Sequence, residues 1–178
     1  PSGHVEEVAA FLADFGRQLN LDTTIDAAGN VLIKKPASPG MEDRPTVILQ
    51  GHMDMVPQKT PESRHDFATD PINAYLDGGW IRADGTTLGA DDGIGVALAL
   101  AVLESNTLQT GPIEAVFTVD EETTMAGANG LQPGELEGRL LINLDSETEG
   151  EFTIGSAGGE HVDVAATYAE VPAPAANQ

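Results

Sequence analysis

Hydrophobic positions follow two different periods along this chain. Between residues 5 and 19 they recur at helical spacing, which predicts an amphipathic helix. Residues 21–25 and 31–35 instead predict two short strands, and the turn-forming segment Ala28-Gly29-Asn30 between them predicts a β-hairpin. The chain therefore opens with a helix that is followed by a hairpin.

Further along, short continuous apolar runs predict strands that are buried on both faces of a sheet. These runs are residues 46–50, 113–119 and 140–144. Residues 93–103 predict a helix whose many small side chains would let it lie close to a sheet, and residues 80–83 predict another short strand. The proline-rich and charged segment 51–77 predicts an irregular surface loop. Because strands alternate with helices, we expect an α/β fold, a three-layer α/β/α sandwich with a mostly parallel central sheet.

Composition narrows the classes of function. The chain has 178 residues, 40% of them hydrophobic, which is enough for one domain with a buried core. Its 29 Asp and Glu against 8 Lys and Arg give a net charge of -21. This charge argues against nucleic acid and anionic membranes as partners, because both require clustered cations. No apolar run has the length of a membrane span and no signal peptide is visible, so a cytoplasmic location is expected.

Acidic side chains follow the predicted strands or precede a helix at four places. The four segments are Gly51-His52-Met53-Asp54, Gly89-Ala90-Asp91-Asp92-Gly93, Asp120-Glu121-Glu122 and Asn143-Leu144-Asp145. Open α/β sheets bind ligands beyond the carboxyl ends of their strands, so we expect these side chains to converge. Crowded carboxylates need a counter-charge, and a pair of divalent metal ions supplies it. Since the chain has no Cys, imidazole and oxygen would be the ligands.

Each segment has an ordinary interpretation when it is considered alone. A single His such as His52 is more often a hydrogen-bonded core residue than a metal ligand. Asp91-Asp92-Gly93 would usually be a turn or a helix cap, and Asp120-Glu121-Glu122 a solvated loop. It is their joint placement at strand ends in one α/β unit that favours a metal site.

The same segments resemble the zinc peptidases and deacylases of the aminoacylase/carboxypeptidase type. The motifs around His52 and Asp91 carry the likeness, which extends from the first helix to Gly159. Two further segments, Met55-Val56-Pro57-Gln58-Lys59 and Asp145-Ser146-Glu147, point to the aminoacyl-histidine dipeptidase (Xaa-His dipeptidase) branch of that family. The resemblance implies a zinc-peptidase-like catalytic domain and metal-dependent hydrolysis of the peptide bond of dipeptides.

The resemblance also implies a set of metal ligands for two Zn²⁺ ions, with Co²⁺ or Mn²⁺ as alternatives. His52 and Asp145 would bind the first ion and Glu122 the second. Asp91 would bridge the two ions, and the peptide bond after it, to Asp92, would be cis.

Two further residues would have catalytic roles by the same likeness. Glu121 would be the general base, which takes a proton from the attacking water and passes it to the leaving amine. Asp54 would lie on the same side of the chain as His52, because residues two apart in a strand share a face. It would hold the second ring nitrogen of His52 and so fix its tautomer.

Members of this family are longer than this chain. Their second metal takes another His from late in the sequence, and a separate lid domain completes the site. We therefore expect residues 1–160 to be the N-terminal portion of the catalytic domain and residues 161–178 to begin the lid domain or a tail. A homodimer would form through that lid. His4, His65 and His161 are not expected to replace the missing ligand, which weighs against activity of this segment alone.

Other interpretations stay open at this point. The chain could belong to a related tripeptidase or to an N-acyl amino acid deacylase, which share the metal motifs. In this truncated form it could be a non-catalytic metal-binding domain. The acids could also act only as solubilising surface charge.

Overall fold

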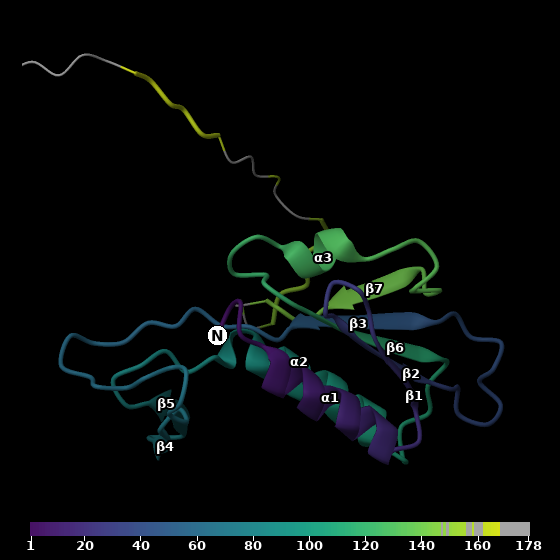
Figure 1. The fold of residues 1–178 in the computed structure, drawn as a ribbon. Helices are drawn as coiled ribbons and strands as arrows, with labels where there is room; N and C mark the ends of the chain where they lie inside the picture. The colour runs from purple at the N-terminus through teal and green to yellow at the C-terminus, as the bar shows by residue number, and fades with distance from the viewer. Residues whose placement is uncertain (147, 149, 156–157, 159–161, 168–178) are drawn as a thin grey trace, which may run out of the picture. The chain divides into compact units, whose positions relative to one another are not determined.

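The computed structural model describes residues 1–146, 148, 150–155, 158 and 162–167 (Figure 1). Pro1–Glu147 forms one compact unit and Thr148–Gln178 a second. The first unit contains all the helices and strands of the described residues. Of the range 161–178, which was predicted to begin a lid domain or tail, only residues 162–167 are described, and they form neither helix nor strand.

The central sheet has five strands in the order β1-β2-β6-β3-β7. Their bounds are Asp22–Ile25 for β1, Val31–Lys35 for β2, Val47–His52 for β3, Ile113–Thr118 for β6 and Leu140–Asn143 for β7. β3 pairs in parallel with both β6 and β7, whereas the β1–β2 hairpin joins the sheet in antiparallel orientation through β2 and β6. Every residue of β6 is buried, as the continuous apolar run predicts for a strand covered on both faces.

Helices cover both faces of this sheet, which confirms the predicted α/β/α layering (Figure 1). α1 (Glu6–Gln18) and α2 (Ala90–Glu104) lie on one face, over a core that includes Leu12, Ile33 and Phe117. On the other face, Leu32, Ile48 and Val116 are buried beneath Leu131 and Leu136, in the segment that follows the short α3 (Ala126–Gly130).

Two elements were not predicted from the sequence. β4 (Ala74–Asp77) falls within the segment predicted to be irregular and pairs with β5 (Trp80–Ala83). Gly78 and Gly79 form the two-residue turn of this hairpin with φ angles of 55° and 87°, a conformation that glycine adopts without a steric penalty. α3 has only five residues, which is too short to show a helical period.

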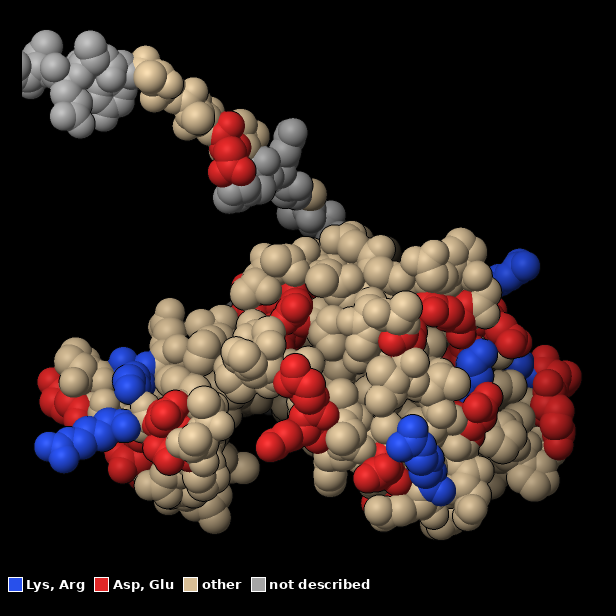
Figure 2. Space-filling view, viewed as in Figure 1, with Lys and Arg blue, Asp and Glu red and all other residues tan. Residues whose placement is uncertain are grey.

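Negative charge predominates on the face of the molecule shown in Figure 2, in line with the net charge of -21. Acidic side chains occur across the face shown in Figure 2, and only a few basic side chains lie among them. In the part of the chain that the structure describes, no helix is both long and apolar enough to cross a bilayer.

Lys35, the last residue of β2, caps the C-terminal end of α2 with its side chain. Its Nζ donates hydrogen bonds to the carbonyl oxygens of Val102 at 2.9 Å, Leu103 at 2.9 Å and Ser105 at 2.6 Å. The last carbonyls of a helix lack partners within the helix and carry partial negative charge, so a lysine here is favourable. This contact fixes α2 against the sheet, and α2 carries Asp91 at its other end.

We predict that Lys35→Met lowers the free energy of unfolding by about 1.5–3 kcal/mol, because three carbonyls lose a charged donor while the aliphatic packing remains. Arg17→Met is the control, since Arg17 is exposed and forms an ion pair with the exposed Asp14, and its loss should cost less than about 1 kcal/mol. Urea unfolding followed by circular dichroism measures both. Equal losses in the two variants would contradict the capping role.

Candidate metal centre

The predicted acidic segments meet at one edge of the sheet. β3, β6 and β7 run parallel, and their register pairs His52 with Thr118 and Gln50 with Asn143, so the three strands end side by side. Glu121 and Glu122 follow β6, and Asp145 follows β7. Asp91 comes to the same edge from the first turn of α2. This is the edge at which open α/β sheets bind ligands.

His52 lies at the centre of this cluster and is 1% exposed. Its Nε2 lies 2.9 Å from Asp91 Oδ1 and 3.7 Å from Asp145 Oδ2. Its Nδ1 lies 2.9 Å from the main-chain oxygen of Asp54, which can only accept a hydrogen bond. Nδ1 therefore carries a hydrogen, and Nε2 is the ring nitrogen that faces the acids. This is the arrangement that a metal-binding His requires.

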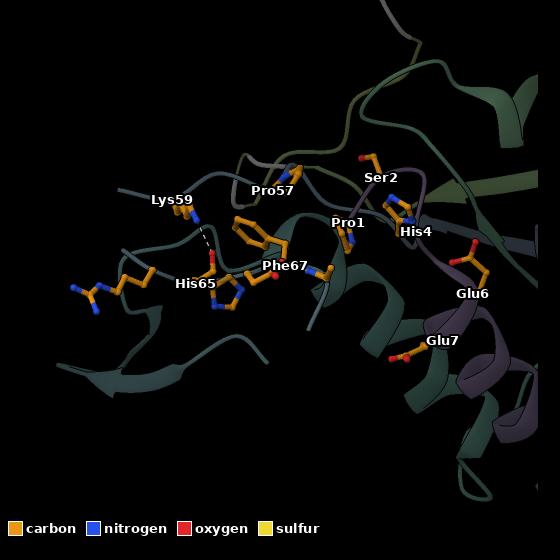
Figure 3. Close-up of a pocket in the computed structure, with 12 residues that line it drawn as sticks. Pro1, Ser2, His4, Glu6, Glu7, Pro57, Lys59, His65 and Phe67 are labelled. Atoms are coloured by element: carbon orange, nitrogen blue, oxygen red, sulfur yellow. Dashed lines mark hydrogen bonds between the residues drawn. The ribbon is translucent and has the colours of Figure 1, made fainter. Parts of the chain in front are cut away.

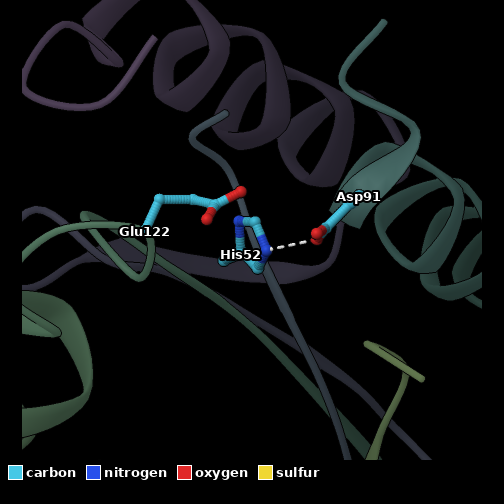
Figure 4. A group of neighbouring side chains, drawn as sticks. All are labelled: His52, Asp91 and Glu122. Carbon is cyan, nitrogen blue, oxygen red and sulfur yellow. Dashed lines mark hydrogen bonds and ion pairs between the residues drawn. The ribbon is translucent and has the colours of Figure 1, made fainter. Parts of the chain in front are cut away.

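Five side chains provide two overlapping groups of ligand atoms. One atom from each of His52, Asp91 and Glu122 lies within 4.8 Å of the other two, and these side chains point toward one another in Figure 4. His52, Glu121 and Asp145 form a second group by the same criterion. All the metal ligands predicted from the sequence are thus brought together. The assignment of each acid to one of two ions remains a prediction.

The electrostatics of the cluster show acids held close together. Burial, followed by the charges of Asp92 and Asp91, raises the pKa of Asp145 to about 6. Burial and the charge of Asp91 also raise the pKa of Glu122. For His52, burial lowers the pKa, but the hydrogen bond to Asp91 and the nearby acids outweigh it and raise the pKa overall. A divalent cation would relieve the repulsion that these shifts express.

Asp54 makes contacts that the sequence did not indicate. Its carboxylate is buried and accepts hydrogen bonds from the main-chain N–H groups of Glu121 at 3.0 Å and Glu122 at 3.3 Å, and from Ser2 Oγ at 2.7 Å. Asp54 Oδ1 lies 3.4 Å from His52 Nδ1, farther than the main-chain oxygen of Asp54 itself. The carboxylate therefore holds the loop that carries the two glutamates, and the main chain holds the imidazole.

Asp92 is a site residue for which sequence reasoning proposed no role in the site. It is 2% exposed, and its carboxylate accepts hydrogen bonds from the main-chain N–H groups of His52 and Gly95, each at 3.1 Å. A Cβ atom at Gly51 or Gly95 would collide with this carboxylate. The Asp92–Gly95 contact has the spacing of a helix cap, which is the signal that could have identified Asp92. The Asp91–Asp92 peptide bond is cis, as the resemblance implies.

The other two histidines that the structure describes, His4 and His65, lie outside these groups. His4 and His65 line a cavity of about 840 Å³ between the N-terminal segment and residues 57–68 (Figure 3). The ring of His65 packs edge-on against Phe67, with ring centroids 4.6 Å apart. Ser2 lines the same cavity. His161 is not among the described residues.

Solved structures are similar to this chain in both fold and sequence. The crystal structure of aminoacylhistidine dipeptidase from Vibrio alginolyticus matches with a TM-score of 0.82 and 53% identity, over 84% of this chain and 31% of that one. A tripeptidase from Staphylococcus aureus matches with a TM-score of 0.69 and 25% identity, over 83% of this chain and 39% of that one.

Sequence comparison gives the same assignment. The chain is 50% identical over 159 residues to the cytosol non-specific dipeptidase of Escherichia coli (strain K12), which covers 89% of this chain and 33% of that protein. It thus spans about a third of the length of that relative. The sequence model of Peptidase family M20/M25/M40 matches residues 48–172, which is most of the chain. The chain belongs to Peptidase family M20/M25/M40.

Proposed function

We propose that this chain is the N-terminal portion of a metal-dependent dipeptidase that acts on Xaa-His-type dipeptides. The observation that supports it most directly is the convergence of His52 with four carboxylates at one sheet edge. The relatives from Escherichia coli and Vibrio alginolyticus, at 50% and 53% identity, are both dipeptidases by name. A site of this composition, in a chain this similar to them, supports the same reaction.

The donors in the cluster fit divalent metal ions. Imidazole and carboxylate oxygens suit Zn²⁺, and they also accept Co²⁺ or Mn²⁺. We infer two ions, with His52, Asp91, Glu122 and Asp145 as their ligands in this chain. The two ligand groups adjoin at His52, whose Nε2 can bind one ion, and the two oxygens of the Asp91 carboxylate would allow Asp91 to bridge to a neighbouring ion. When bound, the ions would lower the pKa of a water molecule and polarise the substrate carbonyl.

Side chains of the protein would then carry out proton transfer and hold the site in position. Glu121 would take the proton of the attacking water and return it to the leaving amine. The Asp54 carboxylate would keep Glu121 and Glu122 in place through their main-chain N–H groups. The Nδ1 hydrogen bond of His52 would keep its Nε2 directed at the metal site.

Several wider properties belong to the same proposal. Residues 1–160 would form the N-terminal part of the catalytic domain, and residues 161–178 would lead into a lid domain through which the protein dimerises. The length of the relatives, about three times that of this chain, supports a further domain. A cytoplasmic location is supported by the name of the Escherichia coli relative.

A tripeptidase is the second candidate. It is favoured by the structural match to the Staphylococcus aureus tripeptidase, although at 25% identity. Hydrolysis of dipeptides, tripeptides and N-acyl amino acids by the full-length protein separates the two candidates and also tests the deacylase alternative. A clear preference for dipeptides is expected.

We predict that Zn²⁺ stabilises this chain against heat and that chelation by EDTA reverses the effect. An ion that binds only the folded state at about 100 times its dissociation constant adds about 2.7 kcal/mol to the free energy of unfolding. The shift should shrink strongly in His52→Ala and remain in Glu104→Gln, which removes an exposed acid outside the cluster. Differential scanning calorimetry with and without Zn²⁺ gives the answer. A wild-type melting temperature unaffected by Zn²⁺ would mean that the acids serve only as surface charge.

We predict different effects for the two adjacent glutamates in the full-length protein. Glu121→Gln should lower kcat by about 10²–10⁴, the usual contribution of a general base, while the affinity for Zn²⁺ is retained. Glu122→Gln should weaken Zn²⁺ binding, because it removes a charged ligand. Turnover assays and isothermal titration calorimetry measure the two effects. Retained turnover in Glu121→Gln would remove that residue from its catalytic role.

A further inference from the structure

The N-terminal segment is attached directly to the proposed catalytic site. The Ser2 hydroxyl donates to Asp54 Oδ2 at 2.7 Å, and the main-chain N–H of Ser2 donates to the Met55 carbonyl oxygen at 3.2 Å. The next residue, Gly3, donates its N–H to Asp120 Oδ1 at 2.6 Å. Residues 2 and 3 therefore contact both the segment after β3 and the loop after β6, which carries the glutamates.

Asp54 depends on such donors because it is a buried carboxylate. Its side chain is 0% exposed, and no Lys or Arg of the described residues forms an ion pair with it. A buried charge is costly unless hydrogen bonds satisfy it. Three groups donate to it: the N–H of Glu121, the N–H of Glu122 and the Ser2 hydroxyl, which is the closest of the three. Asp54 Oδ2 accepts two hydrogen bonds, one from the Ser2 hydroxyl at 2.7 Å and a longer one from the main-chain N–H of Glu122 at 3.3 Å.

The Ser2 hydroxyl is not needed to anchor the segment itself. The main-chain bonds from Ser2 to Met55 and from Gly3 to Asp120 already do so, and neither uses a side chain of the segment. The hydroxyl also lies 3.4 Å from the Met55 carbonyl oxygen, but its shorter contact, at 2.7 Å, is with the carboxylate that holds the two glutamates. Removal of the hydroxyl therefore tests mainly the Asp54 contact and leaves both main-chain bonds of the anchor.

We propose that Ser2 is a positioning residue of this site. Its hydroxyl orients the Asp54 carboxylate, and Asp54 in turn sets the position of the Glu121–Glu122 main chain. The catalytic part of this inference rests on the proposed function; the structural part does not. Ser2 also lines the cavity between the N-terminal segment and residues 57–68, so the contact lies beside open space (Figure 3).

The structural part is tested by amide hydrogen exchange, measured by NMR on this chain without metal. In Ser2→Ala, the Glu121 and Glu122 amides should exchange about tenfold faster, because their acceptor loses its closest donor. The amides of Val116 and Phe117 in β6 should keep their rates. Ser2→Thr retains the hydroxyl and should restore slow exchange, whereas Ser105→Ala removes a hydroxyl at the far end of α2 and should have no effect on the glutamates.

The catalytic part is tested in the full-length protein. Ser2→Ala should lower kcat about tenfold with KM within about twofold of wild type, and Ser2→Thr should recover most of the loss. Unchanged exchange at Glu121 and Glu122 in Ser2→Ala would overturn the proposal, and so would faster exchange throughout β6, which would indicate general destabilisation. A wild-type protein without hydrolytic activity would refute the proposed function, while the exchange data would still decide the role of Ser2.

Discussion

The repulsion between carboxylates at one sheet edge is the constraint on which the rest of this structure depends. Asp91, Glu122 and Asp145 lie around a single buried imidazole, and the pKa of Asp145 is raised to about 6 by burial and by its acidic neighbours. Nothing in an α/β fold requires such crowding. The fold tolerates it because other groups fix the surrounding main chain, and a divalent cation would relieve the repulsion that remains.

The main chain around the site is held by two buried carboxylates, those of Asp92 and Asp54, and neither belongs to the two ligand groups. Asp92 links the main chain of β3 at His52 to the first turns of α2 at Gly95. Asp54 links the segment after β3 to the loop after β6. Both use main-chain N–H donors, which satisfy a charge without adding a side-chain cation to the site. Asp92 thus ties α2 to β3, and Asp54 ties the loop after β6 to the segment after β3. β7 needs no such contact, because it is held by its direct pairing with β3.

The sequence predicts those parts of the molecule that depend on local pattern. The helix expected at 5–19 is observed as Glu6–Gln18, and the run at 113–119 as the fully buried β6. The convergence of the acids follows from a general property of parallel sheets. What the sequence does not show is which main-chain groups a buried carboxylate will meet. The contact of Asp92 with His52 joins residues 40 positions apart, and those of Asp54 with Glu121 and Glu122 join residues 67 and 68 positions apart, so no spacing rule covers them.

The overall charge of -21 gives the same acids two distinct physical roles. Acids on the surface keep their water and contribute a long-range field that raises the local concentration of cations. At the sheet edge, Glu122 and Asp145 lose part of their water, and this burial raises the pKa of each carboxyl group. Composition cannot separate the two sets, since Glu104 and Glu122 are identical in a count. Their position around His52 separates them, and the strand order that brings them there is therefore what turns part of an acidic chain into a candidate metal site.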